Sequence, residues 1–193
     1  MPIENNLSAC RFLFSFLIVL RNERSIMKIQ VSTAVKEGTT QLGAFDAALY
    51  ATGVSDRNLI RLSSVIPPNT QVEVLDNSIE TTLGGWGDRL YVVYAEQRSS
   101  TPGEGVWAGI GWVQDDIDGK GLFVEHEGTS EEQVRQDIRN SLKDLMSTRG
   151  IDFGQINMVV AGGVCKGKPI CAFAVAVYQA SDWQNKPEIL NHD

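Results

Sequence analysis

The sequence predicts a single domain of mixed α/β (α+β) class. Short strand-like runs of apolar residues recur along its 193 residues, and clusters of Gly, Pro and Ser separate them. Two further segments, near residues 44–51 and 134–146, repeat their apolar residues at helical spacing. The sequence has no internal repeat, and its 42% hydrophobic content suffices for one sizeable core. These observations give no support for a division into two domains.

The first half of this domain is expected to open with a strand over Lys28–Val35, where apolar and polar residues alternate. Helical spacing follows over residues 44–51, and Gly53 is expected to end that helix as its C-terminal cap. Asp46 is expected in the first turn, where the helix dipole favours a carboxylate. A short alternating strand is predicted over Gln71–Leu75.

The second half contains the most clearly marked helix. Thr129 and Glu132 have the spacing of a capping box. Apolar residues then repeat at helical spacing as far as Met146, and Gly150 follows. The remaining apolar segments are predicted as strands because they are β-rich or continuously apolar: Leu90–Ala95, Val106–Val113, Leu122–His126, Ile156–Val160 and Cys171–Val177.

Composition excludes some classes of protein. The net charge of −7 argues against a nucleic-acid partner, which usually meets a basic face, and suits a cationic substrate through weak electrostatic steering. Cys10, Cys165 and Cys171 provide no disulfide framework and match no common zinc spacing. The expected compartment is therefore the cytoplasm, and we expect no metal site.

The amino-terminal segment, residues 1–26, is expected to be a leader or upstream extension outside the fold, which would occupy residues 27–193. Its apolar run Cys10–Leu20 is too short to span a bilayer as a helix, so no stable membrane insertion is expected. The run is similar to the hydrophobic region of a signal peptide. However, no Lys or Arg precedes it, and no small-residue cleavage site follows it.

A pair of serines carries the most specific signal. Ser63 and Ser64 lie within Asn58–Pro68, an otherwise apolar run that two prolines end, and we expect this run to be extended and to face the core. One interpretation is simply a strand near a turn. The other is chemical: in a strained peptide bond, the Ser64 hydroxyl can attack the Ser63 carbonyl and convert the amide into an ester. Elimination and loss of ammonia then leave a ketone, a pyruvoyl group, which forms Schiff bases with amines.

The segment from Leu42 to Pro68 resembles the pyruvoyl-dependent arginine decarboxylase family. The likeness rests on the serine pair, the upstream Asn58 and the triplet AFD around Asp46, which keep the family's spacing, and a weaker match lies at GLFVEHEG. It covers about Met27 to the end of the chain. The resemblance implies a four-layer αββα sandwich and autocatalytic cleavage into a small chain ending at residue 63 and a large chain, 64–193, headed by a pyruvoyl cofactor.

The resemblance also assigns roles to individual residues. Asn58 would assist cleavage by hydrogen-bonding the oxygen that becomes negative as the hydroxyl attacks. Asp46 would hold the substrate guanidinium, with Leu42 lining the same pocket. Glu125 would return a proton after decarboxylation, although Glu127, two residues on, faces the same side of a strand.

The activity implied is conversion of L-arginine to agmatine and CO2 by a lyase that begins as a zymogen. Family members assemble as trimers or paired trimers, with sites between protomers, so a homo-oligomer is expected. Two alternatives remain open from the sequence. One is a pyruvoyl decarboxylase for a different amino acid, and the other is an unprocessed, non-enzymatic binding or regulatory homologue.

Overall fold

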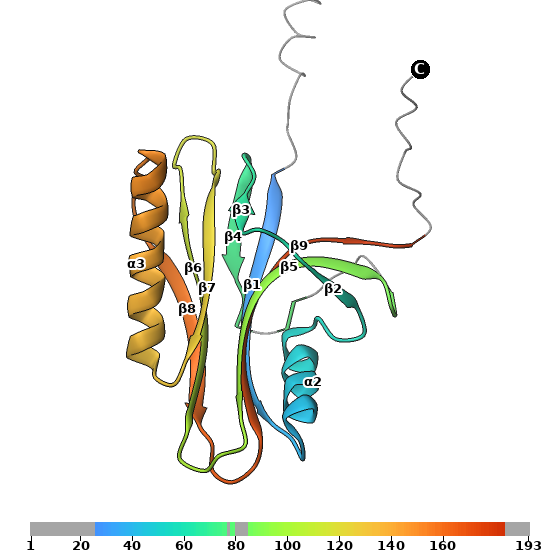
Figure 1. Cartoon of the computed structure of the whole chain (residues 1–193). Helices are drawn as coiled ribbons and strands as arrows, with labels where there is room; N and C mark the ends of the chain where they lie inside the picture. Colours follow the sequence, from blue (N-terminus) through green and yellow to red (C-terminus); the bar gives the residue numbers. More distant parts are fainter. Residues whose placement is uncertain (1–25, 77, 80–84, 184–193) are drawn as a thin grey trace, which may run out of the picture.

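Two β-sheets pack face to face, and one helix covers the outer face of each sheet (Figure 1). The computed structural model describes residues 26–76, 78–79 and 85–183. The layer order is α3, sheet B, sheet A and α2, so the predicted αββα sandwich is confirmed. The elements are β1 Met27–Glu37, α2 Gln41–Thr52, β2 Asn58–Arg61, β3 Val65–Ile66, β4 Thr70–Val74, β5 Arg89–Ser99, β6 Gly105–Gln114, β7 Gly121–Gly128, α3 Glu131–Arg149, β8 Asn157–Val164 and β9 Ile170–Ser181.

Sheet A has the strand order β2-β5-β9-β1-β4, and sheet B has the order β3-β7-β6-β8. Neighbouring strands are antiparallel except in the pairs β1/β4 and β2/β5. β9 lies at the centre of sheet A, and its residues from Ile170 to Val177 are all buried. A continuously apolar strand is therefore explained by burial on both faces, against α2 on one side and sheet B on the other.

The space between the sheets is filled by side chains that alternate with those facing the helices. Ala174 and Ala176 of β9 meet Phe123 of β7 and Ile110 of β6 in this core, whereas Phe173 faces α2. On the other side of sheet B, α3 packs closely because β6 has a glycine beneath it. A Cβ at Gly111 would lie 2.1 Å from the Ile138 side chain.

The two helices end where the sequence predicts. Gly53 and Gly150 both take the left-handed conformation and cap α2 and α3. The predicted capping box is wrong by one residue, because Ser130, not Thr129, accepts the hydrogen bond from the Gln133 amide. Within the described residues, neither helix is long and apolar enough to cross a membrane.

The first helix begins earlier than the apolar spacing indicates. Thr40 is its N-cap, and its hydroxyl accepts a hydrogen bond from the Gly43 amide. Asp46 therefore lies beyond the first turn, so the dipole explanation for a carboxylate there is wrong. The predicted leader lies almost entirely outside the described residues, and its separation from the domain stays a prediction.

The run from Asn58 to Pro68 is not one core-facing strand, as the sequence suggests. It forms β2 at the edge of sheet A and then β3 at the edge of sheet B, and of these eleven positions only Ile66 is buried. The Leu62 amide still donates to the Val92 carbonyl of sheet A, while the Ser64 carbonyl already accepts from the Phe123 amide of sheet B. The serine pair thus lies where the chain crosses from one sheet to the other.

Candidate active site

Ser64 has a strained backbone at this crossing. Its φ of 65° lies in the left-handed region, which a non-glycine residue enters at a cost of about 1–3 kcal/mol. The Phe123 amide donates to its carbonyl at 2.8 Å, and the two-residue strand β3 begins immediately afterwards. Pairing on either side therefore holds a conformation that the residue would otherwise avoid.

The side chain of Ser64 meets Glu125. The hydroxyl oxygen lies 2.7 Å from Oε1 and 2.9 Å from Oε2 of the carboxylate, so it donates to Glu125. Glu125 reaches this position because alternate residues of β7 face opposite sides. Phe123 and Glu125 share the face toward sheet A, while Val124 faces α3. The sequence did not predict this contact, because it joins residues that are distant along the chain.

The environment of Glu125 favours its protonated form. Burial raises the pKa of Glu125, and the charge of Glu127 adds to the rise. The hydrogen bond from Ser64 and the positive charge of Arg61 act in the opposite direction, but the net shift of this pKa is upward. A carboxyl group with a raised pKa can both accept and return a proton near neutral pH.

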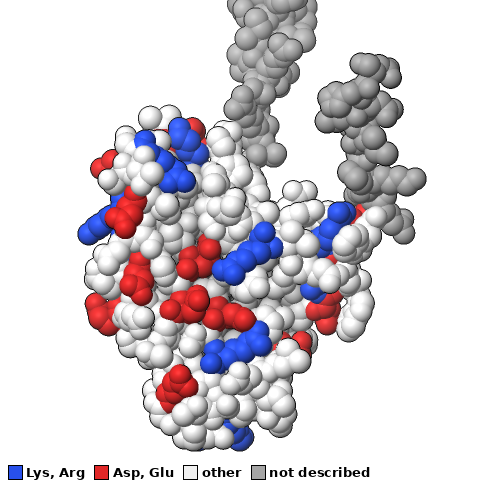
Figure 2. Space-filling view, in the orientation of Figure 1, with Lys and Arg blue, Asp and Glu red and all other residues white. Residues whose placement is uncertain are grey.

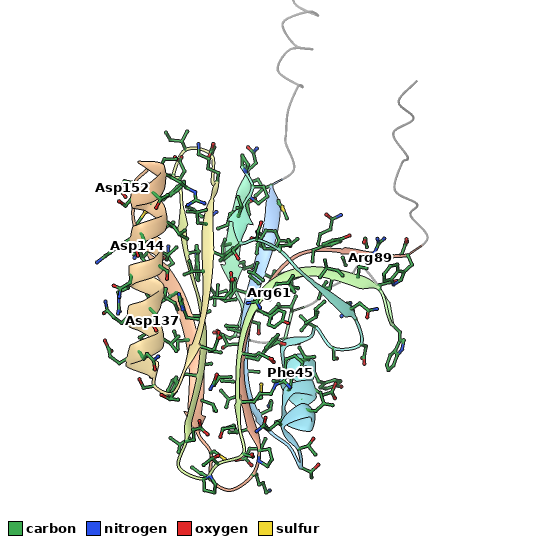
Figure 3. All side chains as sticks on the ribbon, in the orientation of Figure 1. Phe45, Arg61, Arg89, Asp137, Asp144 and Asp152 are labelled. Carbon is green, nitrogen blue, oxygen red and sulfur yellow. The ribbon has the colours of Figure 1, made fainter. Side chains whose placement is uncertain are left out.

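Arg61, the last residue of β2, provides the nearby positive charge. Its guanidinium donates to the Tyr94 carbonyl at 2.9 Å and lies 4.8 Å from the centroid of the Tyr94 ring. In Figure 3 Arg61 lies near the centre of the view, between α3 with Asp144 and α2 with Phe45. Figure 2 shows acidic side chains gathered across the middle of the same face, with basic side chains directly beside them.

A cavity of about 410 Å³ opens beside this pair, within the size range of small-molecule sites. It extends from β7 to α3, and its lining residues are Ser64, Phe123, Val124, Glu125, His126, Ser141, Asp144 and Leu145. Because β3 pairs only with Gly121 and Leu122, no other strand of the described residues covers the edge of β7 along the cavity. The volume suits an amino acid.

The two neighbours of Glu125 are placed differently. Glu127 is exposed and, unlike Glu125, does not line the cavity. His126 faces α3, and its Nε2 lies 2.9 Å from the Ser141 hydroxyl. The geometry therefore favours Glu125 over Glu127 as the acid beside residue 64.

Asn58 makes a contact that differs from the predicted one. Its carboxamide donates to the Gly87 carbonyl at 2.5 Å, and its backbone amide donates to the Asp88 carbonyl. This side chain thus joins β2 to the turn before β5. The predicted hydrogen bond to the carbonyl of Ser63 is not formed in this arrangement, and a role of Asn58 in cleavage stays a prediction.

Leu42 and Asp46 do not reach the cavity of their own protomer. Both are exposed on α2, Leu42 to 69%, and sheet A separates that helix from sheet B. Phe45, between them in the helix, instead turns inward and packs against Phe173 with a centroid distance of 5.7 Å (Figure 3). The substrate-binding roles of Leu42 and Asp46 therefore stay predictions.

Tyr178 is a site residue that sequence reasoning missed. Its hydroxyl donates to the Val65 carbonyl at 3.2 Å, and its ring lies edge-on to Phe123. Burial raises the pKa of Tyr178, and the charge of Glu125 raises it further. A single tyrosine at the end of an apolar strand was the only sequence signal. Among the described residues, no three His, Cys, Asp or Glu side chains gather as metal ligands would.

Comparison with known proteins gives a consistent result. Residues 28–182 match the family model for pyruvoyl-dependent arginine decarboxylase. The pyruvoyl-dependent arginine decarboxylase of Thermococcus kodakarensis is 32% identical over 76% of this chain and 91% of its own length. That of Pyrococcus abyssi is 32% identical over 75% and 89%, and that of Methanocaldococcus jannaschii is 32% identical over 72% and 82%, respectively.

Proposed function

Since the chain belongs to the pyruvoyl-dependent arginine decarboxylase family, we propose that it cleaves itself between Ser63 and Ser64 and then converts L-arginine to agmatine and CO2. The observation that supports this most strongly is the hydrogen bond from the Ser64 hydroxyl to Glu125, formed at a residue with a strained backbone. A nucleophilic hydroxyl that is hydrogen-bonded to a base is the arrangement that attack on a neighbouring carbonyl requires.

In the first step, Glu125 accepts the hydroxyl proton as Oγ of Ser64 bonds to the carbonyl carbon of Ser63. The peptide C–N bond breaks, and the nitrogen of residue 64 takes up a proton. Loss of the α-hydrogen of residue 64 then breaks the new ester, which leaves Ser63 with a free carboxylate and residue 64 as dehydroalanine. Water replaces the nitrogen, which departs as ammonia, so that residue 64 ends as a pyruvoyl group.

The residues around position 64 fit such a group. The Phe123 amide and the β3 pairing would hold its backbone, and Glu125 lies next to the side chain that is converted. The pyruvoyl group would supply an electron sink for the electron pair that decarboxylation leaves on the substrate. Burial raises the pKa of Glu125, and this residue returns a proton to that carbon.

The substrate side chain is recognised between protomers. A neighbouring chain would place Asp46 against the guanidinium, where a carboxylate can form paired charge-assisted hydrogen bonds, and Leu42 beside the aliphatic stem. The uncovered edge of β7 leaves the cavity open to such a neighbour. The exposure of both residues in one protomer is consistent with this arrangement, and the functional form that we propose is a trimer or hexamer. The cytoplasm remains the proposed compartment.

Intact-mass analysis tests the cleavage. Purified protein incubated to completion should yield one fragment that ends at Ser63 and a second that begins at residue 64 and is lighter by one ammonia than simple hydrolysis would give. Ser64→Ala should stay intact. Ser63→Ala is the matched control and should still cleave, because the reaction uses only the carbonyl of that residue.

The cleaved protein should release CO2 from arginine, and borohydride with arginine should attach the substrate covalently at position 64. A chain that stays intact throughout would instead indicate the non-enzymatic alternative. Release of CO2 from another amino acid alone, in a panel of amino acids, would contradict the assignment of arginine.

A further inference from the structure

Tyr178 connects the two sheets at the residue next to the cleavage site. It belongs to β9 of sheet A, while Val65, whose carbonyl accepts its hydrogen bond, belongs to β3 of sheet B. β3 is an edge strand of two residues, and β7 pairs with one side of it only. The hydroxyl of Tyr178 therefore binds a backbone oxygen on the side of β3 that has no partner strand among the described residues.

Strand alternation directs Tyr178 to this place, because Ala174, Ala176 and Tyr178 face the core between the sheets, whereas Phe173, Val175 and Val177 face α2. Val92 of β5 pairs with Val177, but the preceding Tyr91 pairs with Gln179, so Tyr178 is the additional residue in β9. This β-bulge leaves Tyr178 without a partner residue in β5. Here Tyr178 joins the core between the sheets, where its ring centroid lies 6.0 Å from that of Phe123.

We propose that Tyr178 is a positioning residue that holds residue 64 above Glu125, both before and after the chain is cut. This inference rests on the proposed function and goes beyond the residues that the family resemblance assigns. Before the cut, the covalent link to Ser63 helps to fix Ser64. Afterwards that link is lost, and the new chain end is held by the Phe123 amide, the β3 pairing and Tyr178.

The chemistry of Tyr178 suits a fixed donor. Its phenol is partly buried and close enough to Glu125 for the carboxylate charge to raise its pKa, so the hydroxyl keeps its proton across the working pH range. It does not line the cavity, whose wall is formed by β7, α3 and Ser64. We therefore expect its effect on the reaction to pass through the position of residue 64 and not through contact with the substrate.

Tyr178→Phe tests the inference because it removes only the oxygen. We expect self-cleavage and, in the fully cleaved protein, kcat for arginine each to fall about fivefold to tenfold, the rate equivalent of one hydrogen bond. KM should change less than twofold, since the residue does not touch the substrate. Tyr94→Phe is the matched control, with both rates expected at the wild-type level, because its ring contacts with Phe173 and Arg61 do not need the hydroxyl.

The outcomes separate this inference from the proposed function. Wild-type protein that neither cleaves nor releases CO2 would refute the function itself. Active wild-type protein together with a Tyr178→Phe variant of equal cleavage rate and kcat would refute only the positioning role. A raised KM at unchanged kcat would also refute it, because that pattern indicates contact with the substrate. Thermal melting of each variant checks that a rate change does not come from partial unfolding.

Discussion

Replacement of Glu125 by glutamine removes the proton-transfer group and keeps the shape of the side chain. The Ser64 hydroxyl, 2.7 Å from the carboxylate, can still donate to the amide oxygen, so its position changes little. What is lost is the ability to accept the hydroxyl proton and later to return one, a function worth about 10²- to 10⁴-fold in rate. We therefore expect both self-cleavage and decarboxylation to slow by at least about 100-fold.

The two steps can be measured separately. Cleavage is followed as the loss of intact mass with time, and decarboxylation is measured as CO2 release after the slowly cleaved variant has been purified away from its precursor. Glu127→Gln is the matched control, since Glu127 is exposed on the same face of β7 and does not line the cavity. Normal cleavage in Glu125→Gln, or both defects in Glu127→Gln alone, would refute the assignment.

Three further perturbations have defined outcomes. Cleavage needs Glu125 ionised and decarboxylation needs it protonated, so the cleavage rate should rise and kcat should fall as pH increases. Because burial raises the pKa of Glu125, both changes should occur at a pH above the usual pKa of a glutamate. The fall in kcat should occur at a higher pH than the rise in cleavage rate, since cleavage consumes the Ser64 hydroxyl, whose hydrogen bond lowers the pKa of Glu125. A kcat that rises with pH would contradict the role of Glu125 as proton donor. Asp46→Asn should raise KM for arginine about tenfold or more and leave cleavage unchanged, and equal KM values would remove its proposed role. Gly111→Ala should cost about 1–3 kcal/mol, seen as a lower melting temperature, because its Cβ would lie 2.1 Å from Ile138; an unchanged melting temperature would show that α3 can shift.

Local sequence was sufficient for the elements that local interactions specify. The apolar stripe of α3 and the glycines that cap both helices were predictable because their spacing and backbone freedom act within one or two turns. The strand β9 was predictable as a buried strand because it is apolar on both faces. Its ends were not, since pairing with β1 and β5 determines how far it extends.

The candidate site was predictable only in part. A serine pair in an apolar run suggested unusual chemistry, and the resemblance to a family supplied Glu125 as the proton donor, but not its contact with Ser64. The crossing between sheets was not predictable, because pairing with β5 and β7, far along the chain, decides it. The contacts of Asn58 with Gly87 and of Tyr178 with Val65 join residues far apart along the chain, so a local pattern cannot show them.

The position of the serine pair decides what happens to the two products of cleavage. The shorter product would carry β1, α2 and β2, and β1 is enclosed between β9 and β4, both of which belong to the longer product. The two products would thus stay associated, because they can separate only if the hydrogen bonds between the strands of sheet A are broken. A break in the backbone between Ser63 and Ser64 would leave every strand pairing of both sheets in place, because that bond lies between β2 and β3.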